Sequence, residues 1–240
     1  MDLTRDALQY IVGMKKAEVI EINGESYTDR DVERVDMQLR AAPITMCTLT
    51  SLLDYLKAGI DETAEKMLVQ VTSPTSVRVL SMLDVDRKRE CLVEVSASVP
   101  DFSYGRYMDQ ESFIISLQAK FLPGGDRELL LKFAGTVKDE SIAEYGDNGV
   151  TQKATIKTGI STVGDAIVPN PVTLRPFRTF VEVEQPESSF VFRMRQGDGR
   201  GVECAVYEAD GGAWKNKAME SVKEYLKEGL KEFPQYTVIS

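Results

Sequence analysis

The sequence predicts an α+β fold, with a predominantly antiparallel sheet built from hairpins and packed by three or four helices, including a C-terminal helix. Strand-like runs follow one another in groups separated by turn residues, and they do not alternate one by one with helices as in βαβ folds. Hydrophobic residues make up 42% of the chain and charged residues 28%, a composition typical of a globular protein with a core. We interpret residues 1–240 as a single α+β domain, with residues 1–44 as a peripheral N-terminal extension in the alternative interpretation.

The first 44 residues predict one helix followed by short strand pieces. Apolar residues at helical spacing indicate a helix over residues 3–12, and Gly13 provides a stop. The apolar run within residues 17–24 indicates a strand. Residues 25–40 are highly charged and alternate poorly, so we expect only strand and turn pieces before a break at Pro43.

The next segment predicts a capped helix and a group of strands. Thr48 or Thr50 can cap a helix whose leucines share one face, and Gly59 can close it. A turn is expected at Pro74, and the basic run 86–90 is expected at an exposed hairpin tip. The predicted elements are a helix over residues 48–59 and strands over residues 67–71, 76–83 and 91–99.

The middle of the chain predicts a second helix and a hairpin. Asp109 is a plausible cap for the helix, and a Pro-Gly-Gly sequence at residues 123–125 ends it. The dipeptide Asn148-Gly149 is a turn signal between two strands. The predicted elements are a helix over residues 108–122, paired strands over residues 129–137 and 150–160, and a loop over residues 166–171.

The C-terminal third has the most regular pattern. Alternating apolar and polar residues indicate three consecutive strands, and a loop with three glycines separates the second from the third. The predicted elements are strands over residues 177–183, 189–195 and 202–208, a helix over residues 213–231, and an edge strand over residues 236–239.

The chain contains no histidine. Histidine is the usual general base and metal ligand at neutral pH, so Ser-His-Asp triads, Cys-His pairs and His-ligated metal sites are excluded. We therefore predict that the protein is not an enzyme and that it holds neither a metal nor a cofactor. The carboxylate pairs that magnesium could use are interpreted as acidic surface; they are Asp84 with Asp86, Asp139 with Glu140, and Glu182 with Glu184.

The net charge of −9 disfavours binding to duplex nucleic acid, which depends on lysine and arginine contacts with phosphates. The cysteines Cys47, Cys91 and Cys204 are far apart and lack metal-ligand spacing, so we expect no disulfide. Cys91 and Cys204 are expected to be small buried apolar residues. The N-terminus does not resemble a signal peptide, and no run approaches the ~18 apolar residues of a membrane span. We therefore expect no membrane association and a cytoplasmic location.

Arginine is dense near the C-terminal strands. Five arginines lie within residues 175–200, and with one phenylalanine they form the candidate ligand-binding set: Arg175, Arg178, Arg193, Arg195, Arg200 and Phe177. Arg193 and Arg195 would share one face of a strand about 7 Å apart. Guanidinium groups suit phosphate or carboxylate ligands, which indicates an anion site. The alternative is a cross-strand ladder of ion pairs with Glu182, Glu184 and Glu203.

Three further segments have two interpretations each. The loop 197–201 is either a flexible binding tip or a hairpin turn that uses glycine for its positive φ angles. The segment 210–214 is either an anion-binding helix N-terminus or a helix start with Asp210 near the cap and a buried Trp214. The aromatic residues Phe102, Tyr104 and Tyr107 either form a stacking loop or pack against one another.

Four strings of the sequence resemble a known phage and prophage family. They are residues 108–118, 129–140, 169–195 and 208–226, and the likeness extends over roughly residues 45–232. The family is that of the YfdQ-like proteins, whose function is unknown. The resemblance implies a phage-encoded protein in the cytoplasm of a host bacterial cell, often grouped with recombination or accessory genes. It transfers no catalytic residues.

Three functions follow as hypotheses. The first is a non-catalytic accessory protein, expected to be a homo-oligomer, that binds an anionic ligand or a host protein; its specific form is counter-defence sequestration of a small anionic nucleotide signal. The second is a recombination or replication protein that contacts single-stranded DNA or another protein. The third is a carboxylate-metal phosphoesterase.

Overall fold

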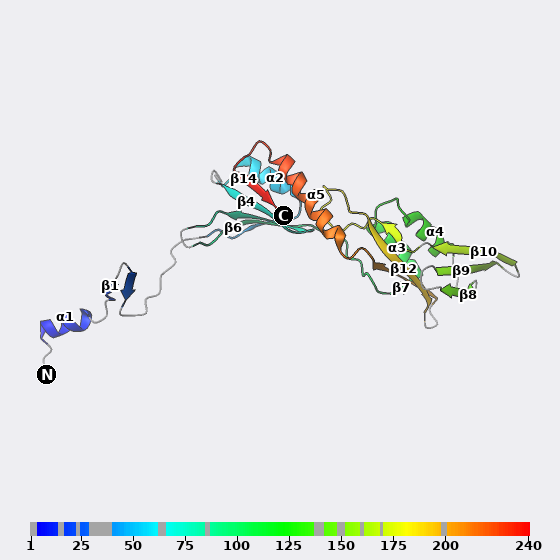
Figure 1. The fold of residues 1–240 in the computed structure, drawn as a ribbon, viewed down its shortest axis with the longest axis horizontal. Helices are drawn as coiled ribbons and strands as arrows, with labels where there is room; N and C mark the ends of the chain where they lie inside the picture. Colours follow the sequence, from blue (N-terminus) through cyan, green and yellow to red (C-terminus); the bar gives the residue numbers. More distant parts are fainter. Residues whose placement is uncertain are drawn as a thin grey trace. The chain divides into compact units, whose positions relative to one another are not determined.

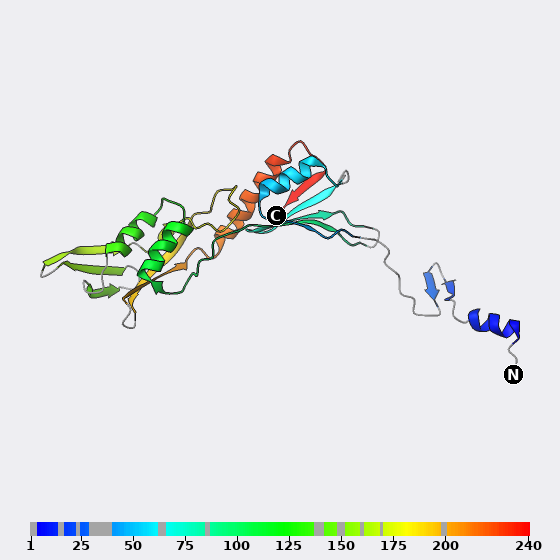
Figure 2. The same ribbon diagram turned by 180° about the vertical axis from the view of Figure 1, so that it is seen from behind.

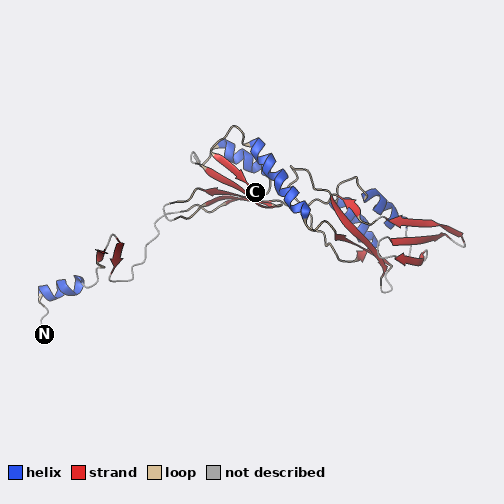
Figure 3. Cartoon of the chain, in the orientation of Figure 1, coloured by secondary structure: helices blue, strands red, loops and turns tan. Residues whose placement is uncertain are grey.

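A computed structural model describes residues 4–13, 17–22, 25–28, 40–61, 66–84, 87–136, 142–147, 152–158, 161–168, 170–197 and 201–240. The chain forms two compact units, Met1–Arg40 and Ala41–Ser240. Figures 1 and 3 show the order and type of the elements. Antiparallel pairing predominates in the sheets, which confirms the predicted α+β class with a C-terminal helix. None of the described helices is long and apolar enough to cross a membrane.

The N-terminal unit contains a short helix and a two-stranded hairpin. The elements are α1 (Arg5–Gly13), β1 (Val19–Ile22) and β2 (Glu25–Thr28). The hairpin is antiparallel, with Ile20 opposite Tyr27. The predicted helix and first strand are confirmed, and the charged stretch begins with a strand piece as expected. Its remainder, residues 29–39, lies outside the described residues.

The second unit contains a five-stranded sheet in the order β14-β4-β5-β6-β3. Strands β4, β5 and β6 pair in antiparallel fashion, whereas the edge strands β3 and β14 pair in parallel with their neighbours. The predicted strands around Pro74 and the predicted C-terminal edge strand are confirmed. The bounds are β3 (Ile44–Met46), β4 (Met67–Ser73), β5 (Ser76–Ser81), β6 (Cys91–Ser96) and β14 (Tyr236–Ile239).

Helices α2 (Leu49–Ala58) and α5 (Ala213–Gly229) lie on one face of this sheet, as Figures 1 and 2 show from opposite sides. The hydroxyl of Thr48 accepts a hydrogen bond from the Ser51 N–H at 3.1 Å, so Thr48 is the N-cap. The two helices approach closely at Gly229, where a Cβ atom would lie 2.6 Å from a methyl group of Leu53. Valine and leucine dominate the core between helices and sheet.

A four-stranded antiparallel sheet with the order β11-β12-β13-β7 holds the second core. Helices α3 (Gln110–Lys120) and α4 (Arg127–Thr136) pack on one of its faces, and helices and sheet together contribute five buried phenylalanines: Phe113, Phe121, Phe133, Phe190 and Phe192. The side chain of Asp109 caps α3, as predicted. The strands are β7 (Met108–Asp109), β11 (Val172–Leu174), β12 (Ser188–Gln196) and β13 (Val202–Glu208).

A separate three-stranded antiparallel sheet has the order β10-β9-β8. Its strands are β8 (Ile142–Asp147), β9 (Gln152–Thr158) and β10 (Ser161–Val168). The predicted strand over residues 150–160 is confirmed, but its predicted partner is wrong because β9 pairs with β8 and β10. The predicted loop over residues 166–171 is also wrong in its first half, which belongs to β10.

The predicted strand over residues 129–137 is wrong, because this segment forms helix α4. Three adjacent leucines suggest a strand locally, yet only Leu130 of the three is fully buried, together with Phe133 and Ala134 at helical spacing. The Arg127 side chain holds the start of the helix by donating to the carbonyls of Leu117 and Gln118 at 2.9 and 3.0 Å. The contacts of residues 127–136 with α3 therefore favour a helix over the strand that the local sequence predicts.

The predicted strand over residues 177–183 is wrong as well, because this segment is an irregular loop. The buried side chain of Gln185 replaces a partner strand: its Oε1 atom accepts from the N–H groups of Arg178 and Thr179 at 2.9 and 3.1 Å. Its amide nitrogen donates to the Phe180 carbonyl at 2.9 Å. These bonds satisfy buried backbone groups without a sheet.

Candidate functional site

The structure divides the arginine cluster, and Arg178 is the buried member. Its residue is only 6% exposed, and its Nη1 atom lies 2.9 Å from Oε1 of Glu208. Its Nη2 atom donates to the hydroxyl of Ser188. The guanidinium carbon lies 4.0 Å from the centre of the Trp214 ring. Arg178 therefore joins β12, β13 and α5 and has little surface left for a ligand.

The network around Arg178 continues to the first turn of α5. Asp210 accepts hydrogen bonds from the N–H groups of Gly212 and Trp214 at 3.0 and 3.3 Å. Burial would raise the pKa of Asp210, but these bonds, a bond from Ser188 and the charge of Arg178 together hold that pKa below its usual value. Because this carboxylate already occupies the helix N-terminus, the structure agrees with the interpretation of Asp210 near the cap, and Gly212 is the N-cap residue. The predicted burial of Trp214 is found only in part, because the residue is half-buried.

Arg175 and Phe177 lie beside the end of α3. The Nη2 atom of Arg175 donates to the Pro123 carbonyl at 3.1 Å, and the N–H of Phe177 donates to the Lys120 carbonyl at 2.9 Å. These contacts tie the loop to the end of the helix. Arg200 lies outside the described residues.

The predicted ion-pair ladder with Glu182 and Glu184 is wrong, because their segment is not a strand. Glu182 instead accepts a hydrogen bond from the Thr50 N–H at 3.2 Å, at the start of α2. One pair of the ladder is confirmed: the Nε atom of Arg195 lies 2.8 Å from Oε2 of Glu203 on the neighbouring strand. A carboxylate at the N-terminus of a helix is favourable, which explains the different place of Glu182.

Arg193 and Arg195 lie on the side of β12 that faces away from the second core. The alternate residues Phe190, Phe192 and Met194 are buried in that core, so the odd-numbered residues point outward. The Arg195 side chain is 57% exposed although it pairs with Glu203. Its guanidinium carbon lies 4.0 Å from the centre of the Tyr107 ring.

Two tyrosines complete this outward side. Tyr107 precedes β7, which pairs with β13, and Tyr207 lies on β13. Burial and the neighbouring Tyr207 side chain raise the pKa of Tyr107, whereas the charges of Arg195 and Arg193 lower it in part. We call Tyr107, Arg193, Arg195 and Tyr207 the arginine–tyrosine face. Sequence reasoning missed Tyr207, although the period-2 pattern of residues 202–208 places it on the side of Glu203.

The remaining aromatic residues of the predicted stacking loop point into the core. The Phe102 ring contacts Phe121 at a centroid distance of 5.0 Å, and Tyr104 stacks on Phe190 at 5.6 Å. Burial raises the pKa of Tyr104 to about 12, with smaller opposing effects of Arg178 and Glu208. The interpretation that this loop packs its own aromatics is therefore confirmed for Phe102 and Tyr104.

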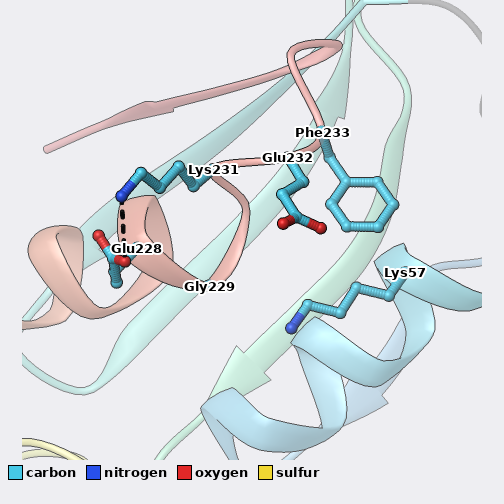
Figure 4. A pocket seen from close by; sticks show the side chains of 6 residues that line it. All are labelled: Lys57, Glu228, Gly229, Lys231, Glu232 and Phe233. Atoms are coloured by element: carbon cyan, nitrogen blue, oxygen red, sulfur yellow. Dashed lines mark hydrogen bonds and ion pairs between the residues drawn. The ribbon is translucent and has the colours of Figure 1, made fainter.

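Two surface pockets lie elsewhere. The first, of about 580 Å³, is lined by Lys57, Glu228, Gly229, Lys231, Glu232 and Phe233. Figure 4 shows Lys231 paired with Glu228, at 3.5 Å, and the lining contains two lysines and two glutamates, so the charges balance. The second, of about 460 Å³, is lined by Thr173, Glu187, Ser188, Ser189, Asp210, Ala213, Trp214 and Lys217. Neither lining includes Arg175, Arg178, Arg193 or Arg195.

Reactive and metal-ligating residues form no further candidate. Within the described ranges, no three histidine, cysteine, aspartate or glutamate residues lie close enough to hold a metal ion. All three cysteines are free thiols: Cys204 is fully buried, Cys91 is half-buried and Cys47 is exposed. Burial raises the pKa of Cys204 to about 12, with a smaller contribution from Asp109, so this thiol stays protonated and unreactive.

No family model matches the sequence, and no curated protein or solved structure matches it either. The resemblance to the YfdQ-like proteins therefore stays a prediction. The arginine–tyrosine face is the candidate site on the geometry alone.

Proposed function

We propose that the protein is a non-catalytic binding protein that holds a phosphate-bearing anionic ligand on the arginine–tyrosine face. The observation that carries this proposal is the pair Arg193 and Arg195 on the outward side of β12, with the Arg195 guanidinium 4.0 Å from the Tyr107 ring. Alternate residues of a strand are about 7 Å apart, which lets two guanidinium groups bind one extended polyanion.

The interaction energies allow a ligand to take the place of Glu203 as the partner of Arg195. An exposed ion pair such as that between Arg195 and Glu203 contributes only about 0–1 kcal/mol, so a phosphate can replace the carboxylate at small cost. Charge-assisted bonds from arginine to phosphate are stronger than neutral hydrogen bonds and have a defined geometry. Arg178 differs, because replacing its buried contacts would leave Glu208 and Ser188 without their partner.

In its specific form, the proposal is that a phage-encoded homo-oligomer sequesters a nucleotide signal of the host cell. Native mass spectrometry of the protein purified from infected, defence-bearing cells tests this form. A stoichiometric small anion released on denaturation supports it, and a bare protein or one that carries a host polypeptide contradicts it.

Isothermal titration with inorganic tripolyphosphate tests the general proposal. We expect the double variant Arg193→Ala/Arg195→Ala to bind at least tenfold more weakly than the unchanged protein. Arg78→Ala is the matched control, because Arg78 also lies on a sheet strand, pairs with a glutamate and has a side chain 54% exposed. Equal loss in both variants, or no binding by the unchanged protein, would contradict the proposal.

A further inference from the structure

The two helices of the second core cover one side of the four-stranded sheet and leave its other side without them. Helices α3 and α4 pack against the side that carries Phe190, Phe192 and Cys204. The opposite side carries the arginine–tyrosine face on β12, β13 and the residue before β7. The contributing residues come from two neighbouring strands and from the residue directly before a third, so the face is a sheet surface and not a loop tip. Sheet surfaces with exposed aromatics are one of the forms in which proteins bind unpaired bases.

The residues of the face provide both planar surfaces and positive charge. The exposed Arg195 guanidinium lies over the half-buried Tyr107 ring, and Tyr207 neighbours Tyr107. Ala205, between Glu203 and Tyr207 on the same side of β13, is fully buried, so the larger side chains lie across it. A base can stack on an arginine plane as well as on an aromatic ring. The Tyr107 ring supports the guanidinium and makes Tyr107 a positioning residue.

The charge of the arginine–tyrosine face differs from that of the chain as a whole. Arg193 and Arg195 lie beside two carboxylates, those of Glu203 and Asp109, so the face is close to neutral, whereas the whole chain has a net charge of −9. A ligand that needs long-range attraction over many phosphates, such as a duplex, is disfavoured. A flexible strand that adds base stacking to two phosphate contacts is favoured, because stacking does not depend on net charge.

We infer that the ligand of the arginine–tyrosine face is a single-stranded nucleic acid, with phosphates on Arg193 and Arg195 and bases stacked on the Arg195–Tyr107 pair and on Tyr207. This inference rests on the general proposal of a phosphate-bearing ligand, and it names a ligand class other than the small nucleotide of the specific form. A free mononucleotide is the weaker candidate, because small-molecule sites are concave and this face is an outward sheet surface.

Fluorescence anisotropy with three labelled probes tests the inference at about 50 mM salt, where phosphate contacts are strong. The probes are a twelve-residue oligothymidylate, an abasic oligomer of the same length and charge, and hexaglutamate. We expect the oligothymidylate to bind at least tenfold more tightly than the abasic oligomer. Hexaglutamate is expected to bind no better than the abasic oligomer.

The variants separate stacking from charge. Tyr107→Leu and Tyr207→Leu are expected to remove the preference for oligothymidylate over the abasic oligomer and to weaken tripolyphosphate binding less than Arg193→Ala/Arg195→Ala does. Tyr107→Phe keeps the ring and is expected to keep the preference. Removal of two phosphate contacts lowers the slope of log affinity against log salt concentration by about 1.4. We expect this change for Arg193→Ala/Arg195→Ala and not for Arg78→Ala.

The failures are distinguishable. Equal, arginine-dependent binding of the oligothymidylate, the abasic oligomer and hexaglutamate would overturn the inference and leave the proposed function standing. A base preference that survives both tyrosine variants would also overturn it. Absence of binding to every polyanion, tripolyphosphate included, would overturn both. Thermal unfolding followed by circular dichroism checks that each variant is folded.

Discussion

The five-stranded and four-stranded sheets of residues 41–240 each carry an exposed arginine in a cross-strand ion pair. Arg78 pairs with Glu94 at 3.2 Å, and Arg195 pairs with Glu203 at 2.8 Å. The arginine side chains are 54% and 57% exposed, so the pairs themselves are equivalent. Their surroundings differ: Arg78 lies opposite Gln70, whereas the Arg195 guanidinium lies on Tyr107. The aromatic neighbour, and not the ion pair, distinguishes a candidate site from ordinary surface.

The interiors of the two sheets differ as well. Aliphatic side chains dominate the first core, which has one buried phenylalanine, whereas the second core has five. The loop of residues 175–187 passes between them: Phe180 is buried in the first core, whereas Arg178 contacts Phe190 of the second. Arg178 therefore makes its buried contacts in the segment of the chain that connects the two cores.

The largest expected effect on stability comes from the aromatic core. Phe192→Ala removes a fully buried ring that contacts Phe113 and Phe133, and it should lower the free energy of unfolding by about 3–5 kcal/mol. Leu52→Ala, in the aliphatic core, should cost about 2–5 kcal/mol. Urea unfolding is followed by circular dichroism and by the fluorescence of Trp214, the single tryptophan. We expect one coincident transition; separate transitions would show that the cores unfold independently.

Arg178→Met tests the junction between the cores. The substitution removes the ion pair with Glu208 and the stacking on Trp214, and we expect a loss on the order of 3 kcal/mol because buried polar partners are left unpaired. Arg178→Lys keeps the charge but not the planar group, so it should recover only part of the loss. A fully stable Arg178→Met protein with unchanged Trp214 emission would contradict this role.

High pH should destabilise both cores. Burial raises the pKa of Cys204 from 9.0 to about 12, and desolvation raises that of Tyr104 and Tyr55 from 10.0 to about 12. Over this window the unfolded chain loses protons that the folded chain keeps, so stability present below pH 9 falls as pH rises toward 12. Urea unfolding at a series of pH values measures the slope. Cys204→Ala should reduce it between pH 9 and 10, and an unchanged slope would contradict the assignment to this thiol.

The smallest effects on stability are expected at the two exposed ion pairs. Arg78→Ala and Arg195→Ala should each change the free energy of unfolding by less than about 1 kcal/mol. Double-mutant cycles with Glu94→Gln and Glu203→Gln measure each pair. A large effect of Arg195 alone would make it a structural residue and would weaken the comparison on which the candidate site depends.

Local patterns predicted much of the fold correctly. The period-2 alternation in residues 189–195 separated the buried Phe192 from the outward Arg193 and Arg195 before any partner strand was known. The cap at Thr48 and the glycine at position 59, which adopts a φ angle of +59°, delimited α2 as expected. These features depend on residues that are close in sequence, so the sequence alone indicates them.

The errors have one physical cause, which is the competition of local propensity with distant partners. The leucines of α4 have a strand-like local pattern, but Arg127 bonds to α3 and the helical set of Leu130 and Phe133 enters the core. Residues 177–183 alternate like a strand, yet the Gln185 side chain satisfies their backbone. Neither contact can be inferred from the segment itself.

The sequence by itself determined the α+β class, the two faces of β12 and the absence of histidine-based chemistry. Only the tertiary structure decided which arginines remain at the surface. Arg178 is buried because Glu208 and Trp214, both about 30 residues or more away in the chain, converge on it, whereas Arg195 is held at the surface against Tyr107. The desolvation of an arginine depends on such long-range neighbours, and the identity of the residue alone does not encode it.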